Sequence, residues 1–162
     1  MLFLYNTCRG QQIRLGLYFN NVLIQVMTFG KPRYNKNFEY ELIRLCTKQG
    51  FVVIGGAERL FKYFITINKP KSIISYCDNA KFDGNVYSKL GFKQEHVSEP
   101  SVHWCNPKTK KHLTDNTIRK YGVDKLLGTN FGKHTCNNQI LLDYGFVQLT
   151  DCGQKTFTFV SI

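Results

Sequence analysis

Apolar and polar positions near the start of the chain follow the two-residue period of β-strands. Residues 12–30, QIRLGLYFNNVLIQVMTFG, form two β-rich runs joined at Asn20 and Asn21. Asparagine tolerates the left-handed conformation that a tight turn needs, so this stretch predicts a β-hairpin. A basic loop, 31–37, follows the hairpin. Residues 38–47, FEYELIRLCT, suit a strand or a helix, and their alternation favours a strand.

The pattern then changes to the longer period of a helix. The short apolar run FVVIGG (51–56) breaks at two glycines, and AERLFKYFITIN (57–68) follows. This second segment predicts a helix that Pro70 closes. Its predicted buried face carries Leu60, Phe61, Phe64 and Ile67.

A strand and a short helix are predicted next. SIISYC (72–77) is apolar enough for a buried strand and ends at Asp78. GNVYSKLG (84–91) predicts a short helix, because Gly91 occupies the usual position after a helix end.

The second half of the chain is predicted to hold a second hairpin, a helix and two closing runs. FKQEHV (92–97) and SVHWCN (101–106) flank Glu99–Pro100 as a hairpin would, and 115–127 predicts a helix. Strands flanking helices predict an α/β (α+β) fold with a mixed central sheet. A length of 162 residues suits one domain.

Composition narrows the class of protein. Apolar residues make up 43% and aromatic residues 14% of the chain, which indicates a globular protein. No apolar run approaches the ~20 residues that span a membrane. The start of the chain lacks the features of a signal peptide. The six cysteines are spread without a Cys-x-x-Cys pair, so we expect free thiols and a cytoplasmic location.

Charge points to a polyanionic partner. The chain has 22 Lys and Arg against 11 Asp and Glu, a net charge of +11. Much of the excess lies between His103 and His134. We expect DNA as the partner. The alternatives are a solvated face and, less favoured, a membrane surface. The candidate contacts are Lys31, Arg33, Lys108, Lys110, Lys111, Arg119 and Lys120.

Two positions locate a candidate site. Gly55 and Gly56 lie at a predicted strand-to-helix turn, where free N–H groups and the helix dipole favour a phosphate. A tight turn with close packing is the structural alternative. Asp78 lies at the carboxyl end of the next predicted strand, where open α/β sheets hold their ligands.

A metal site is a weaker alternative. His103 and Cys105, and again His134 and Cys136, share a spacing that places two ligands on one face of a strand. Together they would offer zinc four ligands. Partly buried side chains near a basic surface explain the same residues. No motif supports iron, and no nuclease signature is present.

Three segments carry a family resemblance: YELIRLC, VVIGGAERLFKYF and SIISYCDNAKFDGNVYSKLGF. They resemble the GNAT (acyl-CoA N-acyltransferase) fold. More narrowly, RLGLYFNNVLIQVMTFG, the ELxR strand and the SYCD…YxxxGF segment resemble the Mom-type branch of phage proteins that modify adenine in DNA. A related domain occurs in phage proteins labelled as homing endonucleases. The likeness covers about residues 4–105.

The resemblance implies a site and a cofactor. Residues 1–105 would form the GNAT-like core, and 106–162 a basic extension packing on the same domain. Arg44, Asp78 and Tyr87 match active-site positions of the Mom-type proteins. Acyl-CoA pyrophosphate would bind at Gly55, Gly56 and Ala57.

Three functions follow as hypotheses. The first is transfer of an acyl-type group to a DNA base amine in the cytoplasm of an infected bacterium. Asp78 would then deprotonate the amine, Tyr87 would protonate the leaving thiolate, and Arg44 would hold Asp78 or a phosphate. The second is a non-catalytic DNA-binding domain, because the turn lacks the full R/Q-x-x-G-x-G/A pattern and Thr7 replaces a histidine of the related domain. The third is a phage protein that blocks a host factor. In the structural alternative, Arg44 and Asp78 form a buried pair that only organises the cleft.

Overall fold

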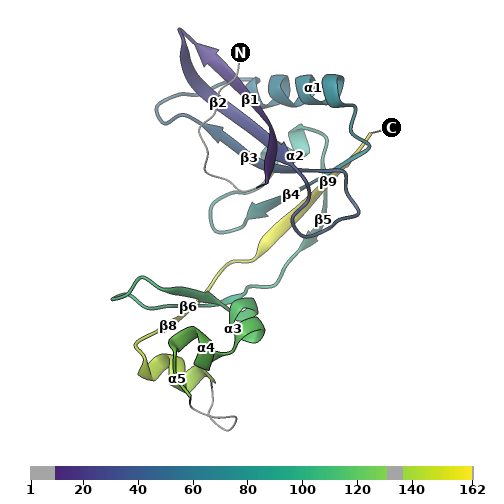
Figure 1. Ribbon diagram of the computed structural model, residues 1–162. Coiled ribbons are helices and arrows are strands. Elements are labelled where there is room, and N and C mark those ends of the chain that lie inside the picture. Colours follow the sequence, from purple (N-terminus) through teal and green to yellow (C-terminus); the bar gives the residue numbers. More distant parts are fainter. Residues whose placement is uncertain (1–9, 131–136, 162) are drawn as a thin grey trace. The chain divides into compact units, whose positions relative to one another are not determined.

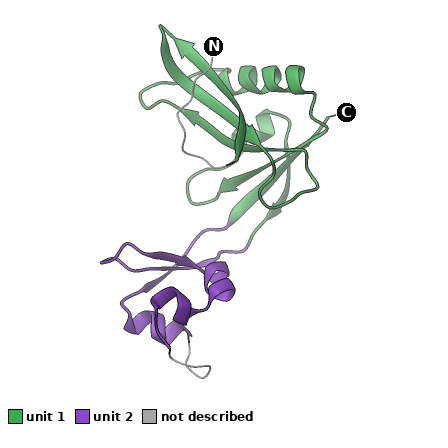
Figure 2. Ribbon diagram, in the orientation of Figure 1, with its two compact units in different colours: residues 1–98, 154–162 green, residues 99–153 purple. Residues whose placement is uncertain are grey.

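The computed structural model describes residues 10–130 and 137–161, which fall into two compact units (Figure 1). Figure 2 shows unit 1, Met1–Ser98 with Gln154–Ile162, and unit 2, Glu99–Gly153. The last strand of the chain therefore returns to unit 1. The expected boundary at residue 105 lies inside unit 2, and the packing of an extension on the core stays a prediction.

Unit 1 is built on a mixed sheet, as the sequence predicts. The sheet has six strands in the order β1-β2-β3-β4-β9-β5. Only β3 and β4 pair in parallel, and the other neighbours are antiparallel. The elements are β1 (Gln11–Phe19), β2 (Val22–Gly30), β3 (Tyr40–Thr47), α1 (Gly56–Asn68), β4 (Ser72–Asp78), α2 (Asn85–Lys89), β5 (Lys93–Val97) and β9 (Gln154–Val160).

The first hairpin is confirmed, together with its turn. β1 and β2 pair from Gln11–Gly30 to Phe19–Val22. The two residues between them, Asn20 and Asn21, have φ of 47° and 60°. Two consecutive residues with positive φ form the turn whose twist matches that of paired strands.

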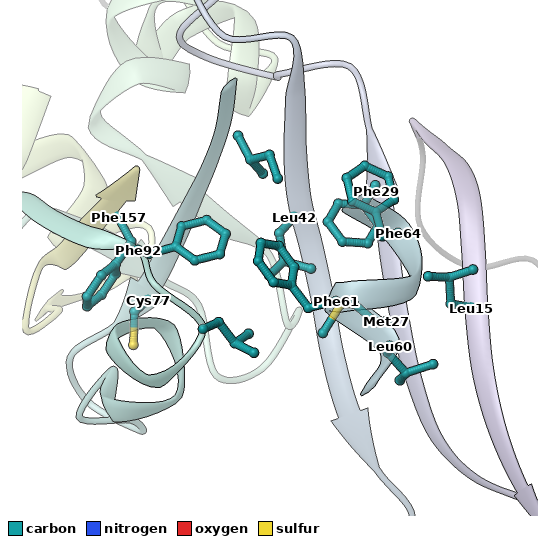
Figure 3. Close-up of a cluster of buried hydrophobic side chains, with 12 residues drawn as sticks. Leu15, Met27, Phe29, Leu42, Leu60, Phe61, Phe64, Cys77, Phe92 and Phe157 are labelled. Atoms are coloured by element: carbon teal, nitrogen blue, oxygen red, sulfur yellow. The ribbon is translucent and has the colours of Figure 1, made fainter. Parts of the chain in front are cut away.

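Helix α1 covers one face of the sheet and supplies much of the core (Figure 3). Leu60, Phe61 and Phe64 are buried, and the Phe64 ring stacks on Phe29 of β2 with 3.5 Å between centroids. The expectation that Ile67 joins this face is wrong, since Ile67 is 63% exposed. At 100° per residue Ile67 lies between the buried Gly56 and Leu60, so its angle fits the buried face and its exposure reflects its position in the last turn of α1.

A β-bulge bends β3 and separates it from β4. Thr28 pairs with Arg44 but Phe29 pairs with Leu42, so Ile43 is an extra residue in β3. A bulge bends its strand and increases the local twist. The β3–β4 ladder accordingly holds only two residue pairs, the last of them between Glu41 and Ile74. Beyond these pairs the two parallel strands part.

Two other expectations are wrong. Residues 51–53 form no strand, so eight residues of loop separate β3 from α1. Residues 92–97 and 101–106 form no hairpin around Glu99–Pro100 either. β5 pairs with β9 instead, which satisfies its backbone in the larger sheet.

Unit 2 has its own sheet and core. Its strands lie in the order β7-β6-β8 and are antiparallel. The predicted helix at 115–127 is two helices, because Gly122 (φ 75°) breaks it. Trp104, Leu113 and Leu141 are among the core residues. The elements are β6 (Val102–Cys105), β7 (His112–Thr114), α3 (Asp115–Tyr121), α4 (Val123–Leu127), α5 (Asn137–Asp143) and β8 (Val147–Thr150).

Asp151 joins the two ends of unit 2. One oxygen, Oδ1, accepts hydrogen bonds from the backbone N–H of Ser101 (2.7 Å) and of Gly153 (2.8 Å). The other, Oδ2, lies 2.9 Å from Nε2 of His103. The Ser101 N–H, then His103 and the Gly153 N–H, lower the pKa of Asp151 to about 2.

Candidate active site

A pocket of about 630 Å³ lies where β3 and β4 part. Its walls are the end of β3 (43–47), the end of β4 (76–78) and residues of the segment 82–87 that leads into α2. Arg44, Asp78 and Tyr87 all line it. The structure therefore brings the three predicted site residues to one cavity at the carboxyl ends of two parallel strands.

Tyr87 presents a hydroxyl at the point where the strands separate. Its ring stacks on Phe157 with 4.8 Å between centroids. Burial raises the pKa of Tyr87, and a hydrogen bond with the Ser75 hydroxyl opposes the rise. Ser75 Oγ in turn donates to the backbone oxygen of Leu42 at 2.8 Å. Sequence reasoning missed Ser75, since nothing in the pattern distinguishes it from other strand serines.

Asp78 keeps part of its carboxylate open. Oδ1 accepts the backbone N–H of Ala80 at 2.9 Å, and Oδ2 lies 3.6 Å from Nζ of Lys81. The Asp78 side chain is 39% exposed and that of Lys81 is 71% exposed. Screening by water makes such a pair weak. The carboxylate can therefore exchange Lys81 for a substrate group.

Arg44 does not form the buried pair with Asp78 that the structural alternative requires. No ion pair joins the two residues in the described part of the chain, and Arg44 is exposed. The physical reason is the bulge at Ile43, after which β3 bends away from β4. The guanidinium is thus available at the wall of the pocket.

The pocket is lined from both faces of the sheet. Cys77 belongs to the core on the face that α1 and α2 cover. Tyr76 and Asp78 point to the opposite face, because successive strand residues alternate. None of the described helices of unit 1 covers that face, which we call the helix-free face. A donor and an acceptor can therefore reach the same cavity from different sides.

The glycine turn serves two separate structural purposes. Gly55 has φ 68°, a conformation that favours glycine. A Cβ on Gly56 would lie 2.1 Å from Oε1 of Gln25, so Gly56 lets α1 approach β2. Ala57 packs partly buried against the core. No side chain caps α1, which leaves first-turn N–H groups for a ligand.

One carboxylate, that of Glu58, disfavours the binding of an anion at the start of α1. Glu58 lies in the first turn of α1, 2.7 Å from Nζ of Lys62. Lys62 lowers the pKa of Glu58, so this carboxylate stays charged.

Three of the side chains predicted to contact DNA already interact with other groups of the protein. Arg33 pairs with the buried Glu41 at 2.5 Å, and Arg119 pairs with Asp115 at 3.0 Å. Lys111 Nζ donates to the backbone oxygen of Leu126. The other four predicted contacts, Lys31, Lys108, Lys110 and Lys120, are exposed.

The excess charge lies mainly in unit 1. That unit has fifteen basic and six acidic residues, whereas unit 2 has seven and five. The basic stretch 103–134 is offset within its unit by Glu99, Asp143 and Asp151. Unit 1, which holds the pocket, is therefore the more basic of the two.

Metal binding has no support within 10–130 and 137–161. No group of three or more His, Cys, Asp or Glu there could hold a metal ion. His103 is instead bound to Asp151 and stacked on His112, with 5.1 Å between ring centroids. The predicted partners His134 and Cys136, like Thr7, lie outside the described residues.

Two further findings concern cysteines and membranes. Cys46, Cys77 and Cys105, three of the cysteines that the structure describes, are free thiols as expected. None of the described helices is long and apolar enough to cross a membrane.

No family model matches the chain, and no curated protein matches its sequence. Among solved structures, it is similar to a Bacillus anthracis str. Ames protein described as a streptothricin acetyltransferase, in complex with acetyl coenzyme A. The TM-score is 0.50 at 13% identity, over 98% of this chain and 66% of that one. A second solved structure, a Bacillus subtilis acetyltransferase in complex with CoA, has a TM-score of 0.48 at 12% sequence identity. That match covers 90% of this chain and 74% of the other.

At this identity the first likeness shows the fold alone. The mixed sheet flanked by helices is a GNAT-like fold, as the sequence predicts. This chain spans 66% of the length of that neighbour. The narrower resemblance to the Mom-type branch stays a prediction.

Proposed function

We propose that the pocket between β3 and β4 transfers an acyl group from an acyl-CoA thioester to an exocyclic amine of a DNA base. One observation carries this proposal. A single cavity at the parting of two parallel strands is lined by Tyr87, Asp78 and Arg44. The proposed activity is that of the Mom-type phage proteins that the sequence resembles.

The residues present fit a thioester donor. Backbone groups of β3 that face β4 beyond Glu41 have no strand partner among the described residues. An extended, amide-bearing arm can pair with such an edge. The uncapped start of α1 lies close by, since Gln25 contacts Gly56 and donates to Thr47 at the pocket wall. When bound, acyl-CoA supplies an activated acyl group with a thiolate leaving group.

The proposed reaction needs two proton transfers, and Asp78 and Tyr87 each carry out one of them. Asp78 accepts the proton that the amine loses as its nitrogen bonds to the acyl carbon. Tyr87 gives its phenolic proton to the sulfur as the carbon–sulfur bond breaks. The raised pKa of Tyr87 keeps the phenol protonated before the reaction, and it also makes the phenol a weaker acid than an exposed tyrosine. Arg44 binds a phosphate beside the target base.

Charge supports DNA as the acceptor. The unit that holds the pocket has fifteen basic and six acidic residues. Such an excess attracts a polyanion and raises its local concentration.

The second candidate, a non-catalytic DNA-binding domain, is favoured by Glu58. A charged carboxylate in the first turn of α1 occupies the place where a donor phosphate would gain most from the helix dipole. This candidate predicts DNA binding without any effect of acyl-CoA.

Purified protein, acetyl-CoA and DNA test the proposal together. We expect release of free thiol that requires DNA and is lost in Tyr87→Phe. Tyr63→Phe is the matched control, because Tyr63 is 58% exposed on α1 and outside the pocket. Acetyl-CoA should also raise the melting temperature, since a ligand of the folded state stabilises it. DNA binding with neither effect would support the second candidate and reject acyl transfer.

A further inference from the structure

A single buried carboxylate fixes the loop between β2 and β3 to the helix-free face of the sheet. Glu41 is fully buried. It accepts hydrogen bonds from the backbone N–H of Arg33 (2.7 Å), from Nε (2.8 Å) and from Nη2 (2.5 Å). The two-pronged contact sets the orientation of the guanidinium as well as its position.

This anchor presents an exposed aromatic ring. Tyr34 follows Arg33 and is 74% exposed. Its ring meets Tyr76 edge to face, with 5.6 Å between centroids at 90°. The Arg33 guanidinium lies 5.7 Å from the centre of the Tyr34 ring. Tyr34 is therefore held in place by both neighbours although most of its surface meets water.

Tyr76, which the Tyr34 ring contacts, is also held in place. A backbone hydrogen bond from Asn35 reaches the Tyr76 hydroxyl. Burial, and then the Glu41 carboxylate, raise the pKa of Tyr76, so its phenol stays neutral. The loop is thus held to β3 through Arg33–Glu41, and to β4 through Tyr34–Tyr76 and Asn35–Tyr76.

Arg33 compensates the buried charge of Glu41, and the same loop leaves most of the Tyr34 ring exposed. A rigid, exposed aromatic side chain of low conformational entropy is typical of a binding surface.

The ring contacts a residue of the pocket wall. Tyr76, which Tyr34 contacts, lines the cavity together with Asp78. The two β4 residues are two positions apart and so share the helix-free face. A planar group resting on Tyr34 would therefore lie on the same face of the sheet as the carboxylate that the proposed function assigns as base.

We propose that Tyr34 is the stacking platform that receives the nucleobase, and that Arg33 positions it. This inference rests on the proposed function only for the choice of a nucleic-acid acceptor. It also replaces the expected role of Arg33 as a phosphate contact, because Glu41 already uses its charge. An aromatic face accepts every base, so the platform selects bases over bare backbone.

Binding of two short single-stranded probes to the full chain tests the platform. One probe is an oligodeoxyadenosine, and the other is an abasic strand of equal length. We expect wild type to prefer the base-bearing probe. Tyr34→Ala should weaken that binding by about 5- to 150-fold, which corresponds to the alanine effect on base stacking. The abasic probe should bind as before, and Tyr34→Phe should keep the preference.

The Arg33→Lys variant distinguishes the positioning role of the Arg33 guanidinium from the effect of its charge. It keeps the charge but loses the fork, so it should bind the abasic probe normally and lose preference for bases. Tyr63→Ala is the control for an exposed tyrosine elsewhere, and thermal melts establish that each variant is folded. Undiminished binding by Tyr34→Ala, or equal binding of both probes by wild type, would overturn the inference. Base preference without thiol release would reject acyl transfer but leave the platform standing.

Discussion

Tyr87 is half-buried and lines the pocket. Burial raises its pKa above the ordinary value of 10.0, so the phenol is protonated throughout the neutral range. The proposed reaction needs the protonated form. We therefore expect no loss of rate from this group as the pH rises toward 10. Titration of Tyr87 in the neutral range, followed by its ultraviolet absorbance against Tyr87→Phe, would contradict the assignment.

Removing the acid or the base should reduce turnover and leave the fold intact. Tyr87→Phe and Asp78→Asn keep side-chain shape, and each should lower the acylation rate by about 10²–10⁴-fold. DNA affinity, measured by anisotropy, should barely change. If the cleft is structural, Tyr87→Phe should instead lower stability by about 0.5–1.5 kcal/mol through loss of its hydrogen bond with Ser75, visible in denaturant melts.

Asp151 makes the stability of unit 2 depend on pH in the acid range. Its pKa falls from 3.8 to about 2 on folding. Because the folded pKa is lowered, this stabilisation is present above pH 4 and disappears as the pH falls through about 2. The stability difference between wild type and Asp151→Asn in urea melts should shrink from pH 5 to pH 2. A constant difference would rule out this linkage.

At the scale of elements, the turn before α1 depends on two glycines for different reasons. Gly56→Ala would place Cβ 2.1 Å from Gln25 Oε1 and 2.5 Å from Val53 Cγ1, and overpacking of this kind costs about 1–3 kcal/mol. Gly55→Ala meets no atom within 4 Å and suffers only its positive φ, about 1–2 kcal/mol. Denaturant melts should show the larger loss for Gly56→Ala, and the reverse order would contradict this account.

Local pattern predicted the elements better than the contacts between them. The Asn20–Asn21 hairpin, α1, β4 and the position of Asp78 follow from periodicity and turn chemistry, which act over a few residues. The pairing of β5 with β9 could not be predicted, because its partner lies about sixty residues later. Neither could the bulge at Ile43, since it arises from how β2 and β3 pair. The pocket depends on that bulge.

The molecule as a whole consists of a basic unit with the pocket and a second unit inserted between β5 and β9. Each unit has its own buried core. We expect unit 1 to fold when a short Asn-Gly turn replaces residues 99–153, since β5 and β9 already pair. A cooperative thermal melt measured by circular dichroism would confirm this, and a molten chain would contradict it.

The distribution of charge predicts which unit binds DNA. If unit 1 dominates, the shortened chain should keep most of the salt dependence of binding, because the slope reports the phosphates neutralised. Changing Lys108, Lys110, Lys111, Arg119 and Lys120 to Ala in the full chain should then flatten the slope only slightly. A slope that collapses in either protein would assign DNA binding to unit 2.

Nucleoside mass spectrometry of DNA from cells expressing the chain tests the central claim most directly, because it detects any transferred group on any base. The account predicts a nucleoside of increased mass in cells with the wild-type protein. That species should be absent with Tyr87→Phe or Asp78→Asn and present with Tyr63→Phe. Unmodified DNA from cells that contain folded wild-type protein would contradict base acylation.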